Sequence, residues 1–309
     1  MVSYAVHWAR ECLAAPPPVE WIVEGIVANE TLNCLFGEGD SKKTYSQIDQ
    51  GICIATGADW LGFSTLQRNV LFVDEECGLP RMQDRIYKTL RGHGIGKPIP
   101  LAFVSMAGFN LMTATATRDL KKLIREVKAQ VIYIDALADV MPGGDENTAR
   151  DTSIVFNNLK KIVHDLHVTI NLIHHANRGG AFRGSSNIRN QVDTMIEVES
   201  KRGSPNMDFK SLKSRDTEPF DFAAVAHFGE TSFRLVNSIG KVKSDDFILN
   251  QLREGITTLE QWEANTPERL KVTAIKPALQ RLMKAGKVVR ANEGGRGDHA
   301  LYQLNGEYK

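Results

Sequence analysis

The stretch GEGDSKKTY, residues 37 to 45, has the residue types and spacing of a phosphate-binding loop, except that Lys42 stands where a second Gly is usual. Backbone amides of such a loop and the start of the following helix direct positive partial charge at phosphates. Lys43 adds a full charge, and Thr44 offers a hydroxyl to a magnesium ion. The residues expected to contact the nucleotide are Gly37, Glu38, Gly39, Asp40, Ser41, Lys42, Lys43, Thr44 and Tyr45.

Lys42 is the one departure from the pattern, and a chance match is the alternative to a working loop. A positive φ at a residue other than Gly costs about 1 kcal/mol. The loop lies between a strand-like run at 31–36 and a helical pattern at 43–56, which is the context that such a loop requires. We therefore expect nucleotide binding, with the Lys42 side chain pointing outward to solvent, to a neighbouring subunit or to the nucleotide.

Acidic residues stand at the ends of two apolar, strand-like runs. Asp135 ends VIYIDAL, where its carboxylate can reach a water bound to magnesium beside Thr44. Asp74, Glu75 and Glu76 end VLFVDEEC, so at least one of them can orient or deprotonate a water at the γ-phosphate. A solvated strand end is the alternative for each acid, but two such ends on one parallel sheet favour a site.

A histidine pair, His174 and His175, ends a third run and precedes ANRGGAFRGSSNIRN. Adjacent residues of a strand point to opposite faces, so zinc is not favoured, and the pair is interpreted either as one core and one surface side chain or as a sensor of the γ-phosphate. The Arg-rich loop after it predicts contact with a nucleic-acid backbone, a mobile surface loop being the alternative. Its basic residues are Arg178, Arg183 and Arg189.

The elements that must position these residues alternate between apolar strands and helical patterns, which predicts an α/β fold with a mostly parallel sheet covered by helices. The expected strands are 31–36, 70–75, 101–105, 131–137 and 168–175, and the expected helices are 43–56, 79–94, 117–129 and 148–166. Beyond residue 190 the runs VDTMIEVE, MDFKSLKS, DFAAVAHF and TSFRLV predict an antiparallel extension on one edge of that sheet.

Three parts are expected along the chain: an N-terminal segment at 1–18, which ends in three prolines, the sheet domain at 19–238 and a small domain at 239–309. Three helices and a hairpin in the small domain have the pattern of a winged helix. Its expected recognition helix and wing carry basic residues that make DNA contact plausible, while docking on a protein or on the chain's own larger domain is the alternative. These residues are Lys271, Lys276, Arg281, Lys284, Arg290 and Arg296.

The composition of the 309-residue chain limits the function classes. A net charge of +1 argues against binding a polyanion by bulk charge, so nucleic-acid contacts must come from local basic clusters. Four cysteines without a CxxC pair favour buried thiols over zinc or disulfides. The sequence shows no apolar run of about 20 residues and no export signal, which predicts a cytoplasmic protein that does not enter a membrane.

In their order, the motifs GEGDSKKT, LFVDEECGLPRMQDR, VIYIDALADVMPGGDEN, INLIHHANRGG and SLKSRD resemble the RecA/DnaB superfamily, and most closely the hexameric replicative helicases of the plasmid RepA type. The resemblance implies a RecA-like domain in which Glu76 rather than Glu75 is the catalytic base, with Arg85 nine positions later. It also implies that Asp135 coordinates Mg²⁺ through water and that His175 senses the γ-phosphate. Lys213 and Arg215 would reach the nucleotide of a neighbouring subunit as fingers.

These features together predict an ATP-driven, Mg²⁺-dependent motor on single-stranded DNA, a replicative helicase of a plasmid, phage or mobile element. We expect a homo-oligomer, a hexamer, in which the loops at 141–150 and 176–190 line a central channel, with other replication proteins as further partners. One alternative is an ATP-gated DNA-binding regulator or recombinase-like ATPase that does not unwind DNA. Another is a repressor-like module in which the winged helix acts and the ATPase fold is inert.

Overall fold

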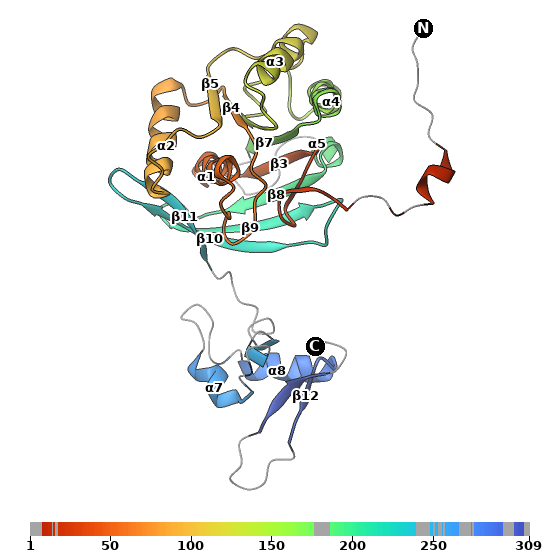
Figure 1. Cartoon of the computed structure of the whole chain (residues 1–309), viewed down its shortest axis with the longest axis vertical. Helices are drawn as coiled ribbons and strands as arrows, with labels where there is room; N and C mark the ends of the chain where they lie inside the picture. The colour runs from red at the N-terminus through yellow and green to blue at the C-terminus, as the bar shows by residue number, and fades with distance from the viewer. Residues whose placement is uncertain are drawn as a thin grey trace. The chain divides into compact units, whose positions relative to one another are not determined.

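The chain divides into two compact units, Met1–Ser238 and Ile239–Lys309. Figure 1 shows the computed structural model of the chain. It describes residues 8–13, 15, 18–175, 186–238, 248–249, 251–252, 255, 257–265, 273, 275–292 and 300–305. Within these residues no helix is both long and apolar enough to cross a bilayer.

A nine-stranded sheet forms the centre of the first unit, with the strand order β11-β10-β9-β8-β3-β7-β6-β4-β5. The strands from β8 to β5 in this order are parallel, and β9, β10 and β11 extend the sheet with antiparallel pairing. The predicted α/β fold with an antiparallel extension is confirmed. The bounds are β3 (Leu32–Gly37), β4 (Val70–Asp74), β5 (Leu101–Ser105), β6 (Val131–Asp135), β7 (Thr169–His175), β8 (Thr194–Glu199), β9 (Asn206–Lys213), β10 (Asp221–Phe228) and β11 (Phe233–Ser238).

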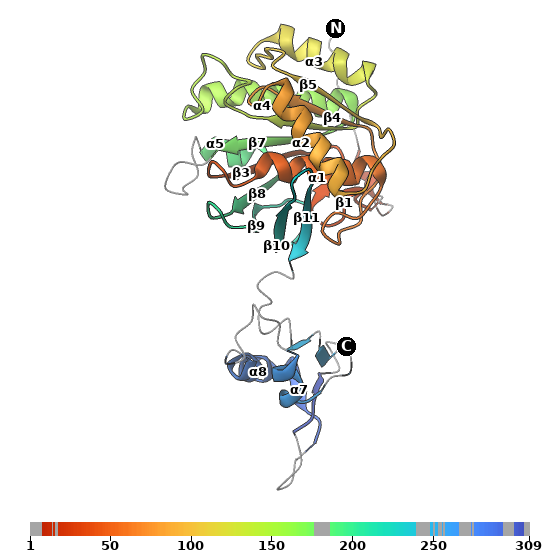
Figure 2. The same ribbon diagram turned by 90° about the vertical axis from the view of Figure 1, so that its left-hand side faces the viewer.

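Helices cover both faces of the sheet (Figure 2). One hydrophobic cluster packs α1 and α2 against one face, and a second packs α3 and α4 against the other. Because apolar side chains leave water on both faces, the central strands β4 and β6 are buried along their whole length. The bounds are α1 (Lys43–Thr56), α2 (Leu79–Gly92), α3 (Ala114–Glu126), α4 (Ala149–Leu166) and α5 (Ser186–Gln191).

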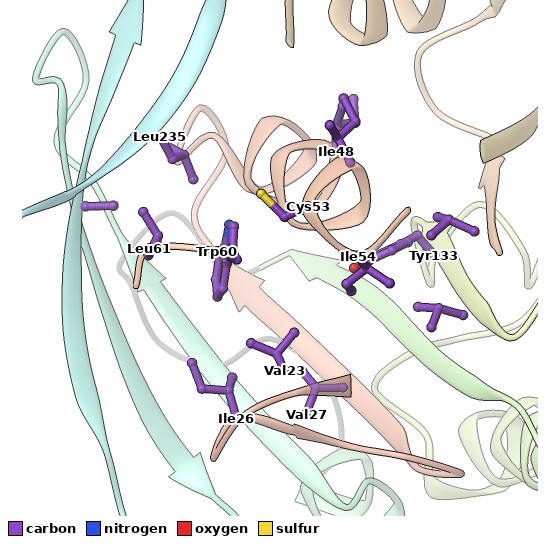
Figure 3. Packing of buried hydrophobic residues seen from close by; sticks show 14 of the residues in the cluster. Val23, Ile26, Val27, Ile48, Cys53, Ile54, Trp60, Leu61, Tyr133 and Leu235 are labelled. Carbon is purple, nitrogen blue, oxygen red and sulfur yellow. The ribbon is translucent and has the colours of Figure 1, made fainter. Parts of the chain in front are cut away.

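The first unit begins with short elements beside α1: η1 (Ala9–Cys12), β1 (Trp21–Val23) and β2 (Val27–Ala28). Figure 3 shows side chains of β1 and β2 next to those of α1 and the loop that follows it, including Val23, Ile54 and Trp60. The helix expected at 117–129 instead begins at Ala114, because the Thr113 hydroxyl accepts a hydrogen bond from Ala116 N at 3.2 Å and caps the helix three residues earlier.

The parallel register brings the predicted chemical residues to one edge of the sheet. Gly37 at the end of β3 pairs with His175 at the end of β7, and Asp74 at the end of β4 pairs with Asp135 at the end of β6. The carboxyl ends of neighbouring parallel strands always meet at the same edge, where ligands of open α/β sheets bind. The fold therefore gathers the loop, the acids and the histidine pair in one place.

The described part of the second unit contains α7 (Leu259–Ala264), α8 (Ile275–Lys284) and a hairpin of β12 (Val288–Arg290) with β13 (Tyr302–Leu304). Trp262 is fully buried and packs with Leu279 and Leu282 in a small core of its own. The first helix expected in this unit, at 244–255, and much of the expected wing lie outside the described residues. The winged helix stays a prediction.

Candidate nucleotide-binding site

The loop at 38–42 joins β3 to α1, as the sequence pattern predicts. Its first residue position admits only Gly, since a Cβ on Gly37 would lie 2.4 Å from the carbonyl oxygen of Val198 on β8. Ser41 closes the turn by donating from its hydroxyl to Glu38 O at 2.7 Å. Lys42 occupies the left-handed region with φ 65°, which is the conformation that the missing Gly would adopt without strain.

Lys43 is buried and its ammonium folds back over the loop. Its Nζ donates to Gly37 O at 2.9 Å, to Glu38 O at 2.7 Å and to Ser41 Oγ at 3.2 Å. Burial lowers the pKa of Lys43 to about 8, although the nearby carboxylate of Asp135 acts in the opposite direction. A phosphate in place of these neutral oxygens would give the ammonium a charged partner.

The Lys42 side chain does not follow the expectation that it points to solvent, to another subunit or to the nucleotide. Its Nζ donates to Ser200 Oγ at 2.7 Å, and Ser200 in turn donates to Asn206 O at 2.7 Å across the turn between β8 and β9. Partial burial lowers the pKa of Lys42. The reason for the difference is that β8 pairs directly with β3, so its carboxyl end lies beside the loop.

Thr44 and Asp135 meet across the site, where Thr44 Oγ1 donates to Asp135 Oδ2 at 2.6 Å. The other carboxylate oxygen, Oδ1, is buried and has no hydrogen-bond partner among the described residues. Burial raises the pKa of Asp135, and the neighbouring Glu76 adds to this shift. One hydroxyl and one carboxylate with an unused oxygen are the kind of oxygen ligands that magnesium prefers.

Asp74, the first of the three consecutive acids, is used to shape the loop after β4. Its Oδ1 accepts from Cys77 N at 2.9 Å, and its Oδ2 accepts from Gly78 N at 3.2 Å and from Ser105 Oγ at 2.6 Å. A buried carboxylate with this many donors is held in place as a structural anion. Asp74 is therefore not available to a reaction.

Glu75, the second acid, also has a structural task. Its two carboxylate oxygens accept from Gly108 N at 3.0 Å and from Phe109 N at 3.2 Å, in the loop after β5. The side chain is turned toward that loop and is occupied there, since both its oxygens have backbone donors. Of the three acids, Glu76 is left to face the nucleotide loop.

Glu76 lies with Asp135 and His175 in a group whose ligating atoms are all within 4.8 Å of one another. His175 Nε2 is 3.5 Å from Glu76 Oε2, and this contact is the main reason why the pKa of Glu76 is lowered. Glu76 thus carries the charge of the acid pair while Asp135 holds a proton more readily. His174 points to the opposite face, where its ring is buried and lies 3.8 Å from Glu146.

Arg85, the residue nine positions after Glu76, lies at the edge of this group. Its Nη1 is 2.6 Å from Cys77 Sγ, and its guanidinium lies 5.4 Å from the ring centroid of Tyr45. Tyr45 itself packs against Phe228 and Phe233 on the β10–β11 hairpin. The last residue of the predicted loop is therefore anchored on an aromatic cluster.

Lys213 and Arg215 are not brought to the loop of their own subunit. The pairing of Lys213 with Met195 places them at the amino end of β8, whereas the loop lies at the other end of the sheet, roughly 17 Å away for a six-residue strand. Lys213 Nζ donates to three backbone carbonyls at the end of α5, and Arg215 pairs with Asp193 at 2.8 Å. Any contact with a nucleotide would have to involve another subunit.

The residues predicted to contact DNA are only partly described. Arg189 is exposed, and its guanidinium donates to Leu212 O at 2.6 Å. In the second unit the side chain of Lys276 is 67% exposed and its Nζ lies 3.6 Å from Glu263. Arg178, Arg183 and Lys271 lie outside the described residues, as does most of the 176–190 loop. Two residues at the site that the motifs do not reveal are Ser200 and Asp193, which no sequence pattern connects to their partners.

The fold and this constellation define a P-loop nucleotide-binding domain: a glycine-bounded loop with a buried lysine, a hydroxyl next to it and acids on neighbouring strand ends. A family model described as AAA domain matches residues 4–181, more than half of the chain. The chain therefore belongs to this AAA domain family. No curated protein matches it by sequence.

Solved structures show the same fold. One of them, the ATPase domain of another protein, is similar with a TM-score of 0.55 at 12% identity, over 74% of this chain and 95% of that one. A DnaB-like replicative helicase, solved for its interactions with primase, is similar with a TM-score of 0.55 at 11% identity, over 73% of this chain and 66% of that one. The predicted resemblance to the RecA/DnaB superfamily is thereby confirmed at the level of the fold.

Proposed function

We propose that this domain hydrolyses ATP and that an oligomer of it moves along single-stranded DNA. One observation carries the proposal: the loop with Lys43, the Thr44–Asp135 pair and the Glu76–His175 pair converge at a single edge of the sheet. Each group has a role in phosphoryl transfer that its environment supports. Structural acids on either side, Asp74 and Glu75, hold the loops in which these residues lie.

Lys43 would exchange the carbonyls of its own loop for phosphate oxygens, and the loop amides would hold the rest of the triphosphate tail. Glu76 is ionised at neutral pH, so its carboxylate can accept a hydrogen bond from the attacking water and orient it. His175 contacts Glu76 and is placed to respond to the terminal phosphate. Thr44 and Asp135 would hold Mg²⁺, which neutralises charge on the phosphates when it is bound.

An oligomer, a hexamer in this proposal, would complete the site. Arg215 lies at the edge of the sheet opposite to the loop and is about half exposed, so it suits a finger that reaches a neighbour's nucleotide. Single-stranded DNA would run past the basic residues of the 176–190 segment. In this proposal the protein is a cytoplasmic replicative helicase of a plasmid, phage or mobile element that works with other replication proteins.

The second unit would add a DNA-contacting or protein-docking surface. It is a compact unit of its own, with two described helices and a hairpin, and its exposed Lys276 belongs to the helix expected to recognise DNA. This favours a winged helix appended to the motor. An ATP-gated regulator or recombinase-like protein would use the same two units without separating strands.

The decisive experiment measures ATP turnover of the full chain with and without single-stranded DNA, for the parent and for Glu76→Gln. The proposal expects turnover that rises several-fold with DNA in the parent and is lost in the variant, while both bind an ATP analogue. Light scattering should show an oligomer when ATP and DNA are present, and a forked duplex should be unwound. A monomer under these conditions excludes the motor, and DNA-stimulated turnover without unwinding supports the regulator instead.

A further inference from the structure

A second group of metal-binding side chains lies outside the nucleotide site, on the middle of α1. The ligating atoms of Asp49, Cys53 and His93 are all within 4.8 Å of one another. Asp49 and Cys53 are four residues apart on α1, so they share one face of the helix. His93 is the residue directly after α2, and its ring is brought to them by the packing of α2 on α1.

This group is buried, but it borders a cavity. Asp49 and Cys53 are each 1% exposed, and the ring of His93 is 10% exposed. The cavity beside them has a volume of about 400 Å³ and is also lined by Asp59 and Arg234. Figure 3 shows Cys53 on the side of α1 that faces Leu235, where β11 closes the cavity. Two carboxylates against one guanidinium make this environment favourable to a cation.

The hydrogen bonds already present leave room for a ligand. Asp49 Oδ1 accepts from Leu235 N at 3.1 Å and lies 2.8 Å from His93 Nε2. A carboxylate has two oxygens and about four lone-pair positions, so Asp49 can keep the bond from Leu235 and still coordinate an ion. The competing interpretation is a buried Asp–His hydrogen bond with no ligand, and this interpretation predicts no metal binding.

We propose that Asp49, Cys53 and His93 form a binding site for a divalent transition-metal ion of the zinc type. One oxygen, one sulfur and one nitrogen are a donor set that zinc accepts, with Asp59 or water left for a fourth position. Zinc bond lengths of about 2.0 to 2.3 Å separate tetrahedral ligands by roughly 3.3 to 3.8 Å. The 2.8 Å contact between Asp49 and His93 would therefore open by about 0.5 Å, and the wider distances would close by up to about 1 Å.

A metal here would join two helices that both lead to the nucleotide site. Helix α1 begins at Lys43, and α2 follows the loop that carries Glu76 and ends at Gly92, directly before His93. An ion bound by both would fix their relative position near β11 without touching the nucleotide. The role of the ion is thus structural, and binding of the metal does not depend on the proposed ATPase activity.

The test is a titration of the full chain with Co²⁺ after removal of metals with a chelator, in excess Mg²⁺ so that the Thr44–Asp135 site is not counted. A Cys ligand gives a thiolate-to-cobalt absorption band in the near ultraviolet, which identifies sulfur coordination. The variants are Cys53→Ser and His93→Gln. Cys77→Ser is the matched control, because Cys77 lies in a different group, with Asp74 and Asp135.

The parent and Cys77→Ser should bind one equivalent and show the band, whereas Cys53→Ser should lose it and His93→Gln should bind about tenfold more weakly or worse. Zn²⁺ should raise the midpoint of thermal unfolding in the parent and in Cys77→Ser, and not in His93→Gln, since an ion that binds only the folded state stabilises it. The proposal is overturned by the absence of saturable one-equivalent binding, by a band that survives in Cys53→Ser, or by one that vanishes in Cys77→Ser. Unchanged affinity in His93→Gln overturns it as well, and this variant carries the test if Cys53→Ser does not fold.

Discussion

Lys42 and Ser200 are 158 positions apart in the chain, and the lysine Nζ donates to the serine Oγ at 2.7 Å. The bond ties the phosphate-binding loop to the turn between β8 and β9, at a position where related loops have a Gly. Lys42 retains the left-handed conformation of that Gly, with φ 65°. The substitution thus leaves the loop geometry intact and adds a contact to a neighbouring strand.

Two replacements of Lys42 separate the backbone strain from the hydrogen bond. Both Lys42→Ala and Lys42→Gly lose the bond to Ser200, but only Gly adopts a positive φ without a steric penalty from Cβ. Lys42→Gly should therefore have a free energy of unfolding about 1 kcal/mol higher than Lys42→Ala, measured by denaturant titration. A double-mutant cycle with Ser200→Ala should show a coupling of about 0.5 to 1.5 kcal/mol. Equal stability of the two Lys42 variants would contradict the assignment.

Glu75 and Glu76 should respond in opposite ways to the same isosteric change. Glu76→Gln should lower ATP turnover by about 100-fold or more while an ATP analogue still binds, because the ionised carboxylate that orients water is lost. Glu75→Gln should leave turnover within a few-fold of the parent and reduce stability by about 1 kcal/mol, since its oxygens serve Gly108 N and Phe109 N. Loss of turnover in Glu75→Gln with an active Glu76→Gln would reverse the roles of the two acids.

The affinity for ATP should depend on pH through Lys43. Its pKa in the free protein is lowered to about 8, so the ammonium that a phosphate requires is present below this pH and is lost above it. Affinity should therefore be nearly constant below pH 8 and fall by up to about tenfold per unit above it. Anisotropy of a fluorescent ATP analogue measures this profile. Lys43→Arg is the control, because a guanidinium stays charged and its affinity, although weaker, should show no such fall.

Arg215 should act on a neighbouring subunit. Arg215→Ala should bind nucleotide like the parent, lose turnover by about 1000-fold, and lose little stability, because its pair with Asp193 is exposed. Mixing Arg215→Ala with Glu76→Gln subunits should restore part of the turnover, since some interfaces then combine an intact Glu76 with an intact Arg215. An equal mixture without any recovery would argue that the arginine does not work between subunits.

Gly37 and Gly39 provide a paired test of the loop geometry. A methyl group at Gly37 would lie 2.4 Å from Val198 O, whereas nothing lies within 4 Å of the same position at Gly39. Gly37→Ala should therefore lower the free energy of unfolding by about 1 to 3 kcal/mol, and Gly39→Ala should change it by no more than about 0.5 kcal/mol. Thermal or denaturant unfolding of both variants gives the comparison. Similar stabilities would mean that β8 does not approach the loop as described.

The parts of this fold that follow from local patterns could be predicted from the sequence. Continuous apolar runs separated by amphipathic helices require a parallel sheet, and a parallel sheet places the ends of β3, β4, β6 and β7 at one edge. This is why the loop, Asp135 and the histidine pair could be assigned to one site from the sequence. Residue pairs that are close along the chain, such as the Thr113 cap of α3, were missed only at the level of a few residues.

Partners that are distant in sequence could not be predicted. The bond between Lys42 and Ser200 depends on β8 lying beside β3, and the division of labour among Asp74, Glu75 and Glu76 depends on the loops after β4 and β5. No periodicity or motif encodes which backbone amides meet a given carboxylate. The same holds for Lys213, whose basic character suggests an exposed finger although its donors are already in use within the subunit.

An ammonium has three donors, and those of Lys213 meet the carbonyls of Arg189, Asn190 and Val192 at the end of α5. In the proposed ring, reaching across to a neighbour would require this lysine to leave those carbonyls and release the end of α5. Filling one catalytic centre would then slacken a helix in the adjoining protomer. A single side chain that has two alternative sets of acceptors would in this way give the ring a means of firing its centres in sequence.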